Sequence, residues 1–185
     1  MLVVGLGNPG SEYEKTRHNI GFMVIDELIK RQNAQKLSSS SFKGELYKFK
    51  NHFLLKPLTF MNLSGESITL VKNFYKIENI VVIHDDLDLP FGTLRFKHGG
   101  GHGGHNGLRS TDDKISKSYA RVRMGIGKPE HKGEVSSYVL SAFNAQEKEY
   151  LDVWISKTCD AVEFLLSNSL DDTSSLHTIK KFKIQ

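Results

Sequence analysis

Two residues that lie far apart in the sequence, His18 and Asp85, are of the types that general-base catalysis requires. His18 stands in Thr16-Arg-His-Asn19, just before a helical pattern and outside its apolar stripe, and Asp85 follows an unbroken apolar run. A carboxylate beside an imidazole holds its tautomer and stabilises the imidazolium that forms when the ring accepts a proton. The pair is therefore a candidate base with its orienting group, although helix-entry histidines and acidic turns also serve purely structural roles.

A glycine-containing turn, Gly5-Leu-Gly-Asn-Pro-Gly10, carries the G-x-G-x-x-G letters of a dinucleotide-binding turn. In such a turn the third glycine opens a helix, whereas here helical periodicity starts only after His18, and Asp26 and Glu27 lie inside that helix rather than at a strand end. We therefore expect no nucleotide cofactor. The turn instead places Asn8 at the carboxyl end of the first strand, where open α/β sheets assemble their sites.

The run Gly99-Gly-Gly-His-Gly-Gly-His-Asn-Gly107 has glycine at six of its nine positions. Glycine loses more backbone entropy on folding than any other residue, so this density indicates a conformational requirement or the close approach of a ligand. Exposed amides before a helix suit a phosphate or an oxyanion, and Asn106 would add a side-chain donor. A flexible linker is the alternative, but periodic sequence on both sides disfavours it.

Histidines and aspartates between 84 and 105 include the ligand types of zinc and di-metal hydrolases. They do not form H-E-x-x-H, and histidines set among glycines would not have a fixed ligand geometry. We expect no metal site.

The net charge of +4 is unevenly distributed. Between Arg95 and Lys132 stand nine basic and three acidic residues, so that this segment is strongly positive while the rest of the chain is slightly negative. Such a segment indicates one face for a polyanion, with an unevenly charged solvated surface as the alternative. Three lysines near the end, Lys180, Lys181 and Lys183, are either part of a solvated tail or further phosphate contacts.

The connector Thr59-Phe-Met-Asn-Leu-Ser-Gly65 precedes a helical pattern. Asn62 or Ser64 can cap that helix, which is a sufficient structural role for either residue. Phe60 and Met61 stand outside any periodic element, so they are either core lids or the apolar wall of a cleft.

Strands alternating with helices place these residues in an α/β fold, a single domain over 1–185 with a twisted mixed sheet flanked by helices. Apolar runs and alternation predict strands at 2–4, 45–49, 52–56, 80–83 and 121–125. Helical spacing predicts helices at 19–32, at 64–76, from 107 to about 118, and from a capping-box pattern at Asn144 onward.

The composition fits one cytoplasmic domain, with 185 residues that are 38% hydrophobic and 25% charged. The single cysteine, Cys159, cannot form an internal disulfide, which fits a reducing compartment. We find neither a secretion signal nor an apolar run near the roughly 18 residues of a membrane helix.

These motifs resemble those of the bacterial-type peptidyl-tRNA hydrolases. They occur in the same order as in that family and extend over nearly the whole chain. The matching motifs are Gly5-Leu-Gly-Asn-Pro-Gly10 with Tyr13, Thr16-Arg-His-Asn19, Thr59-Phe-Met-Asn-Leu-Ser-Gly65, His84-Asp-Asp-Leu-Asp-Leu-Pro90, Gly99-Gly-Gly-His-Gly-Gly-His-Asn-Gly107 and Arg121-Val-Arg-Met-Gly-Ile-Gly127. The segment 110–119 is about two residues shorter than the family pattern. This difference affects the expected shape of the RNA-facing edge more than the expected catalysis.

The resemblance implies a monomeric α/β-class hydrolase that cleaves the ester between a peptide and the 3′ adenosine of tRNA without a metal or cofactor. By position, His18 would activate water, Asp85 would assist it, and Asn8 would distinguish N-blocked from free aminoacyl-tRNA. The residues implied to bind the tRNA 3′ end and the peptide are Tyr13, Phe60, Asn62 and Asn106. Lys97 and Arg123 match positions associated with tRNA phosphates. The competing hypothesis is a non-catalytic RNA-binding module that uses the basic face over 95–132, and it leaves Asn8, His18 and Asp85 unexplained.

Overall fold

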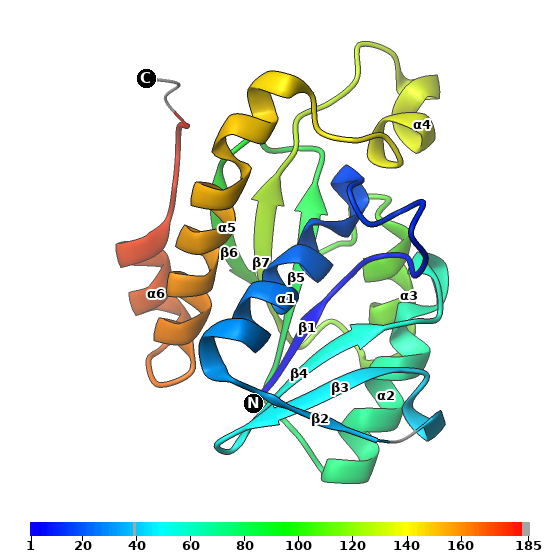
Figure 1. The fold of residues 1–185 in the computed structure, drawn as a ribbon, viewed down its shortest axis with the longest axis vertical. Helices are drawn as coiled ribbons and strands as arrows, with labels where there is room; N and C mark the ends of the chain where they lie inside the picture. Colours follow the sequence, from blue (N-terminus) through cyan, green and yellow to red (C-terminus); the bar gives the residue numbers. More distant parts are fainter. Residues whose placement is uncertain (39, 183–185) are drawn as a thin grey trace.

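A mixed seven-stranded sheet, in the order β2-β3-β4-β1-β5-β7-β6, organises the computed structural model, which describes residues 1–38 and 40–182 (Figure 1). The strands β4, β1, β5 and β7 are parallel, and β2, β3 and β6 add antiparallel pairings at the two edges. The strands are β1 (Leu2–Gly5), β2 (Gln35–Leu37), β3 (Gly44–Phe49), β4 (His52–Pro57), β5 (Ile80–Asp86), β6 (Leu94–His98) and β7 (Ala120–Gly125). The predicted α/β fold with a mixed sheet is confirmed.

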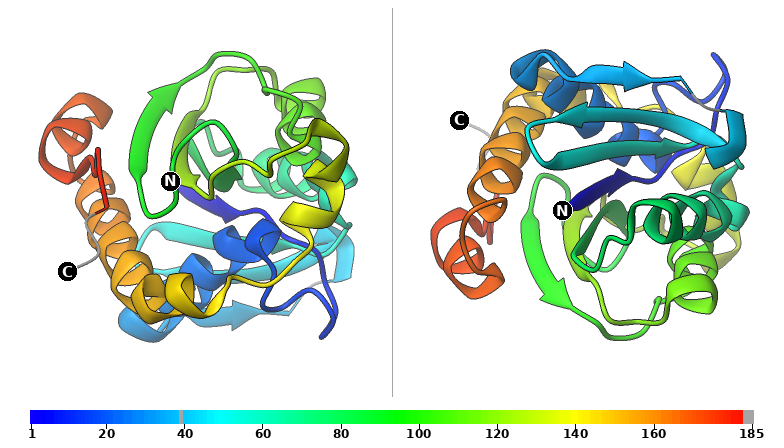
Figure 2. Two further views of the ribbon diagram at one scale, coloured as in Figure 1. Left: turned by 90° about the horizontal axis from the view of Figure 1, so that it is seen from above. Right: turned by 90° about the horizontal axis from the view of Figure 1, so that it is seen from below.

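Helices cover both faces of this sheet (Figure 2). They are α1 (Ile20–Gln32), α2 (Ser64–Tyr75), α3 (Asn106–Ile115), α4 (Val135–Val139), α5 (Ala145–Leu165) and α6 (Leu170–His177). Short 3₁₀ segments span Arg17–Asn19, Ser40–Phe42, Met61–Leu63 and Lys132–Glu134. None of the helices within the described ranges has the length and apolar character needed to cross a membrane.

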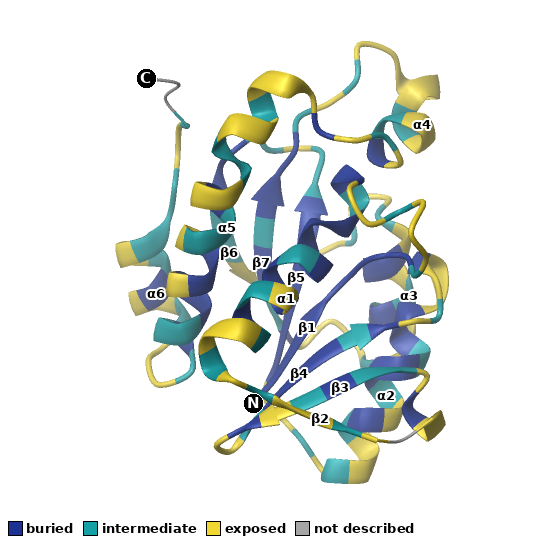
Figure 3. Cartoon of the chain, in the orientation of Figure 1, coloured by how far each residue is buried: buried dark blue, intermediate teal, exposed yellow. Residues whose placement is uncertain are grey.

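The central strands are buried on both faces, which explains their unbroken apolar runs (Figure 3). Val81 and Ile83 of β5 point into the core under α1 and α5, whereas Ile80 and Val82 point into the core under α2 and α3. Because period-two alternation continues past the apolar run, the next residues of β5 also emerge on opposite faces of the sheet. The first of these, His84, lies towards α3, and Asp85 lies towards the start of α1.

Close contact between β1 and α1 depends on two glycines. A Cβ atom on Gly5 would lie 2.2 Å from the carbonyl oxygen of Gly21, and one on Gly21 would lie 2.6 Å from the carbonyl oxygen of Ile83. Only glycine allows the helix backbone this near to the strands. The turn over 5–10 therefore serves helix packing, and α1 begins only at Ile20, as expected for a chain without a dinucleotide-binding turn.

Most of the predicted elements are present, including the hairpin of β3 and β4 and the capping box of Asn144 and Glu147 at the start of α5. Four short elements were not predicted, namely β2, β6, α4 and α6. They are edge strands or helices of eight residues or fewer that bury few residues, so their sequences carry little hydrophobic periodicity. The helix predicted to reach about 118 ends at Ile115, because Ser116 adopts a positive φ of 68°.

Candidate active site

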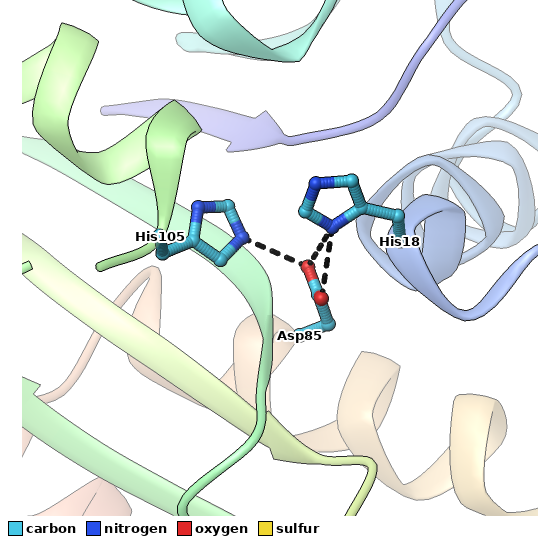
Figure 4. Close-up of side chains that lie close together, drawn as sticks. All are labelled: His18, Asp85 and His105. Atoms are coloured by element: carbon cyan, nitrogen blue, oxygen red, sulfur yellow. Dashed lines mark hydrogen bonds and ion pairs between the residues drawn. The ribbon is translucent and has the colours of Figure 1, made fainter. Parts of the chain in front are cut away.

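Three side chains from separate parts of the chain meet at the carboxyl end of β5 (Figure 4). His18 Nδ1 lies 2.9 Å from Asp85 Oδ2 and 3.0 Å from Oδ1, and His105 Nε2 lies 2.9 Å from Asp85 Oδ1. His18 comes from the 3₁₀ turn that precedes α1, and His105 from the end of the glycine-rich loop. The structure thus brings together the predicted pair and adds a third residue that the sequence reasoning missed.

The contact with Asp85 sets the tautomer of His18. Burial would raise the pKa of Asp85, but the charges and hydrogen bonds of the two histidines outweigh burial and lower that pKa, so the carboxylate is ionised. His18 therefore donates its Nδ1 proton to Asp85, which leaves Nε2 with a free lone pair directed away from the carboxylate (Figure 4).

The same contact sets the proton affinity of His18. Burial would lower the pKa of His18, but the charge of Asp85 and its hydrogen bond outweigh burial, so the pKa is raised above 6.5. A histidine that binds a proton more readily than a free imidazole is well suited to act as a base.

The orientation of His105 is fixed from its other side. As the N-cap residue of α3, its Nδ1 accepts hydrogen bonds from the backbone amides of Gly107 at 3.1 Å and Leu108 at 3.2 Å. Nε2 must then carry the ring proton and donate it to Asp85. The histidine thus occupies these two amides in the first turn of α3, while the side chain of Asn106, the predicted donor, lines the cleft.

The same tautomer bears on metal binding. Ligand atoms of His18, Asp85 and His105 lie within 4.8 Å of one another, as in a possible metal site. A metal-bound histidine donates its second ring N–H to an acceptor, but Nδ1 of His105 faces two backbone donors. If Nε2 of His105 bound a metal, the ring proton would have to sit on Nδ1, where it would face the two amide N–H donors. The arrangement therefore suits hydrogen bonding to Asp85 better than metal ligation.

His84 is a further buried histidine, and it lines the cleft. Its Nδ1 lies 2.9 Å from the carbonyl oxygen of Asp85 and donates to it, while Nε2 has no partner in the described chain. Burial, reinforced by the nearby His105, lowers the pKa of His84 to about 4. His84 is therefore neutral near neutrality.

Asn8 is held so that one amide proton donor remains free. Its Oδ1 accepts the backbone N–H of Met61 at 2.7 Å, and its backbone N–H and carbonyl group bond both atoms of the Asn19 side-chain amide. Within the described residues Nδ2 of Asn8 has no partner, and the residue borders the cleft. Phe60 supports this arrangement with a positive φ of 62°, a strained conformation for a non-glycine residue that directs the next amide to Asn8.

A cleft of about 950 Å³ contains the site. Seven of the nine predicted site residues line it, namely Asn8, His18, Asn62, Asp85, Lys97, Asn106 and Arg123. The segment from Lys132 to Leu140 forms another part of its wall. Tyr13 and Phe60 do not line the cleft but form an edge-to-face pair, with ring centroids 6.4 Å apart, and Phe60 is 51% exposed.

The basic segment over 95–132 is not one uniform face, which corrects the simplest interpretation of its charge. Arg121 is buried and donates to the carbonyl oxygens of Gly101 at 2.6 Å and Gly100 at 2.9 Å, so it anchors the glycine-rich loop. Arg123 pairs with an aspartate on β5 at 2.9 Å. Exposed basic residues of the segment that have no ion pair within the described chain are Lys97, Arg109, Lys114, Lys117 and Lys132.

The fold and the site together define an α/β-class hydrolase, in which a histidine and a carboxylate stand in a cleft bordered by cationic side chains. Comparison with known proteins specifies the class further. The chain belongs to the peptidyl-tRNA hydrolase family, whose sequence model matches residues 2–185.

The similarity extends over whole chains. The chain is 73% identical to a peptidyl-tRNA hydrolase from Sulfurimonas denitrificans over 185 residues, 100% of both chains. It is 54% identical to one from Sulfurovum sp. over 184 residues, which is 98% of this chain and 97% of the relative. A crystal structure of peptidyl-tRNA hydrolase from Acinetobacter baumannii superimposes with a TM-score of 0.92 at 37% identity, covering 97% of this chain and 95% of that one.

Proposed function

We propose that this protein hydrolyses the ester bond joining a peptide, or an N-blocked aminoacyl group, to the 3′ adenosine of tRNA, and thereby recycles tRNA from peptidyl-tRNA released by ribosomes. Membership of the peptidyl-tRNA hydrolase family supports the activity. The observation that carries the mechanism is the hydrogen bond from His18 Nδ1 to the buried Asp85, which leaves Nε2 as a base at the cleft.

In this mechanism Nε2 of His18 accepts a proton from a water molecule as the water oxygen attacks the ester carbonyl carbon. The imidazolium that forms is stabilised by Asp85, which is itself held by His105. Asn62 and Asn106 donate hydrogen bonds to the oxyanion or to the peptide backbone. The ester bond then breaks, and the imidazolium returns its proton to the 3′ oxygen of the leaving tRNA.

A covalent nucleophile is not needed, because an ester is sufficiently activated for attack by water. Cys159 is buried within α5, and burial raises the pKa of its thiol to about 12. The thiol therefore stays protonated and unreactive near neutrality. The proposed reaction uses no cofactor and no metal.

Substrate selection follows from the groups around the base. The free amide nitrogen of Asn8 can donate to the carbonyl of a peptide or blocking group, which a free aminoacyl-tRNA lacks. The exposed ring of Phe60, paired with the half-buried ring of Tyr13, offers a surface for stacking against the 3′ end or the peptide. Lys97 and Arg123 line the cleft, and their positive charges support a role in contacting tRNA phosphates there. We further propose that the protein acts as a cytoplasmic monomer.

A non-catalytic RNA-binding module is the competing function. Such a module would need the exposed lysines but would gain nothing from a buried carboxylate shared by two oriented histidines. The ordered contacts among His18, Asp85 and His105 therefore favour catalysis.

The decisive experiment measures release of the N-acetylaminoacyl group from N-acetylaminoacyl-tRNA in the presence of EDTA. The wild-type protein is expected to cleave, His18→Ala to lose cleavage, and His131→Ala, a change at an exposed histidine outside the cleft lining, to keep it. If neither wild type nor variant cleaves while both bind tRNA, the binding module is supported. If activity returns only on addition of a metal, the three-residue cluster must be reassigned as ligands.

A further inference from the structure

A second groove lies near the C-terminal end of the described chain, with a volume of about 650 Å³ and no lining residue in common with the cleft. We call it the C-terminal groove, and its lining residues are Arg95, Ser174, Ser175, Thr178, Ile179, Lys180 and Lys181. Three of these side chains are cationic, three carry hydroxyl groups, and none is acidic. This combination of groups suits a phosphate ester.

The chain that carries the two groove lysines is held in place on both sides. Ile179 exchanges two backbone hydrogen bonds with Leu94 of β6, at 2.9 and 3.0 Å, so that it extends the sheet edge. The ring of Phe182 packs edge-on against Tyr150 at 4.8 Å and Phe91 at 5.9 Å. The backbone that carries Lys180 and Lys181 is held between these two anchors, which favours phosphate contacts over a solvated tail as their role. The third lysine of that prediction, Lys183, lies outside the described residues.

Arg95 supplies the remaining cation from a different element. It projects from β6, beside which α6 and the chain that follows it lie (Figure 2). Its Nε is buried and has no hydrogen-bond partner in the described residues, and Arg95 forms no ion pair there. Lys180 and Lys181 follow the C-terminal end of α6, where cations interact favourably with the helix dipole. That interaction explains the two lysines but not the presence of Arg95, which comes from β6. An unpaired buried donor next to two exposed lysines indicates a ligand.

The C-terminal groove continues the cationic border of the cleft. Arg95 and Lys97 lie on the same side of β6, two residues and thus about 7 Å apart. Lys97 borders the cleft that contains His18. A single nucleic-acid backbone can therefore pass from the catalytic cleft along the sheet edge to the groove.

We propose that the C-terminal groove binds backbone phosphates of the tRNA, beyond the acceptor end whose terminal ester lies at His18. This proposal rests on the proposed function, since it takes tRNA as the occupant. The groove supplies affinity for the body of the tRNA and takes no part in the chemistry. It therefore distinguishes full-length substrates from short ones.

The test uses the double variant Lys180→Gln/Lys181→Gln, which changes only exposed side chains. Its matched control is Lys30→Gln/Lys36→Gln, which removes the same charge from α1 and from β2 at the opposite edge of the sheet. For each, KM and kcat are measured with N-acetylaminoacyl-tRNA and with the same acyl group on a CCA trinucleotide, between about 50 and 200 mM salt. Fluorescence titration with deacylated tRNA reports binding independently of catalysis.

For the groove variant we expect KM for the tRNA substrate and Kd for deacylated tRNA to rise about three- to tenfold, with kcat and the trinucleotide reaction unchanged. The slope of log Kd against log salt should become shallower by about 1.5, the value for two lost phosphate contacts. A groove variant that binds tRNA like wild type, or like its control, overturns the proposal. If wild type cleaves neither substrate, the proposed function fails, while the titration still decides whether the groove binds tRNA.

Discussion

The cleft has a floor, formed by His18, Asp85 and His105, and a cationic border, which includes Lys97 and Arg123. These two regions hold their charges in opposite ways. On the floor, the side chain of Asp85 is 1% exposed and is bonded by two histidines, one of them fixed in turn by two backbone amides. At the border, Lys97 is exposed and has no ion pair in the described chain. The chemistry requires groups held in one geometry, whereas attraction of a large polyanion requires charges that no internal partner has neutralised.

Strand β7 shows both arrangements two residues apart. The guanidinium of Arg121 is buried beneath the cleft, where it bonds the glycine-rich loop and Asp112. The side chain of Arg123 is 26% exposed, and its pair with Asp86 leaves it at the cleft border. The number of basic residues in a sequence segment therefore does not indicate a binding surface. The burial of each side chain must first show which cations are structural and which are accessible.

The largest expected effect separates the floor from the border. His18→Ala should lower kcat/KM by about 10²- to 10⁴-fold, since it removes the base. The affinity for deacylated tRNA and its salt dependence should stay as in wild type, because no border cation changes. Single-turnover kinetics together with fluorescence titration measure both quantities. A parallel loss of tRNA affinity would show that the floor also contributes to capture.

The next effect concerns pH. The charge of Asp85 raises the pKa of His18, so Asp85→Asn should lower that pKa and move the acidic limb of kcat/KM to lower pH. The plateau should fall by about 10²-fold or more, because the variant loses stabilisation of the imidazolium. The pH profile and an NMR titration of His18 measure the shift. A limb that stays in place, or moves to higher pH, would contradict the role given to Asp85.

A smaller effect contrasts the two arginines of β7. Arg121→Gln leaves Asp112 buried without its cation and should lower the free energy of unfolding by about 3 kcal/mol. Arg123→Gln breaks a partly exposed pair and should cost about 1 kcal/mol or less while raising KM for the tRNA substrate. Urea denaturation and steady-state kinetics on both variants test the contrast. Equal stability losses would remove the distinction between structural and accessible arginines.

The smallest effect concerns a single border lysine. Lys97→Gln should raise KM for the tRNA substrate a few-fold and reduce the salt slope by about 0.7 to 0.9, the value for one phosphate contact. Lys36→Gln, at the far edge of the sheet, serves as the matched control and should change neither quantity. Salt titration of KM compares the two. An unchanged slope in the first variant would exclude Lys97 from phosphate binding.

Much of this arrangement follows from local sequence. The apolar run at 80–83 predicts a buried strand, and strand period two continues to Asp85 at its carboxyl end. The pattern of Asn144 and Glu147 predicts the start of α5, which the capping box confirms. In these cases the residues within one or two turns of chain decide the structure.

The position of His105 shows where local reasoning stops. A histidine among glycines has no periodic environment, and its interpretation as a poorly fixed side chain overlooked its capping of α3. A signal was present, since His105 precedes the helical pattern directly, as N-cap residues do. Its bond to Asp85, however, joins residues 20 positions apart and depends on the path of the loop that Arg121 anchors.

The sequence by itself determined the order of the longer strands and helices, the family motifs and the residue types available for catalysis, because these depend on hydrophobic periodicity and local hydrogen bonding. Only the tertiary structure decided which charges are buried, which nitrogen of each histidine carries the proton, and which lysines form no ion pair within the described chain. Those properties depend on solvent exclusion and on partners brought from distant parts of the chain. The sequence contains the groups, and packing sets the environment that gives each group its chemistry.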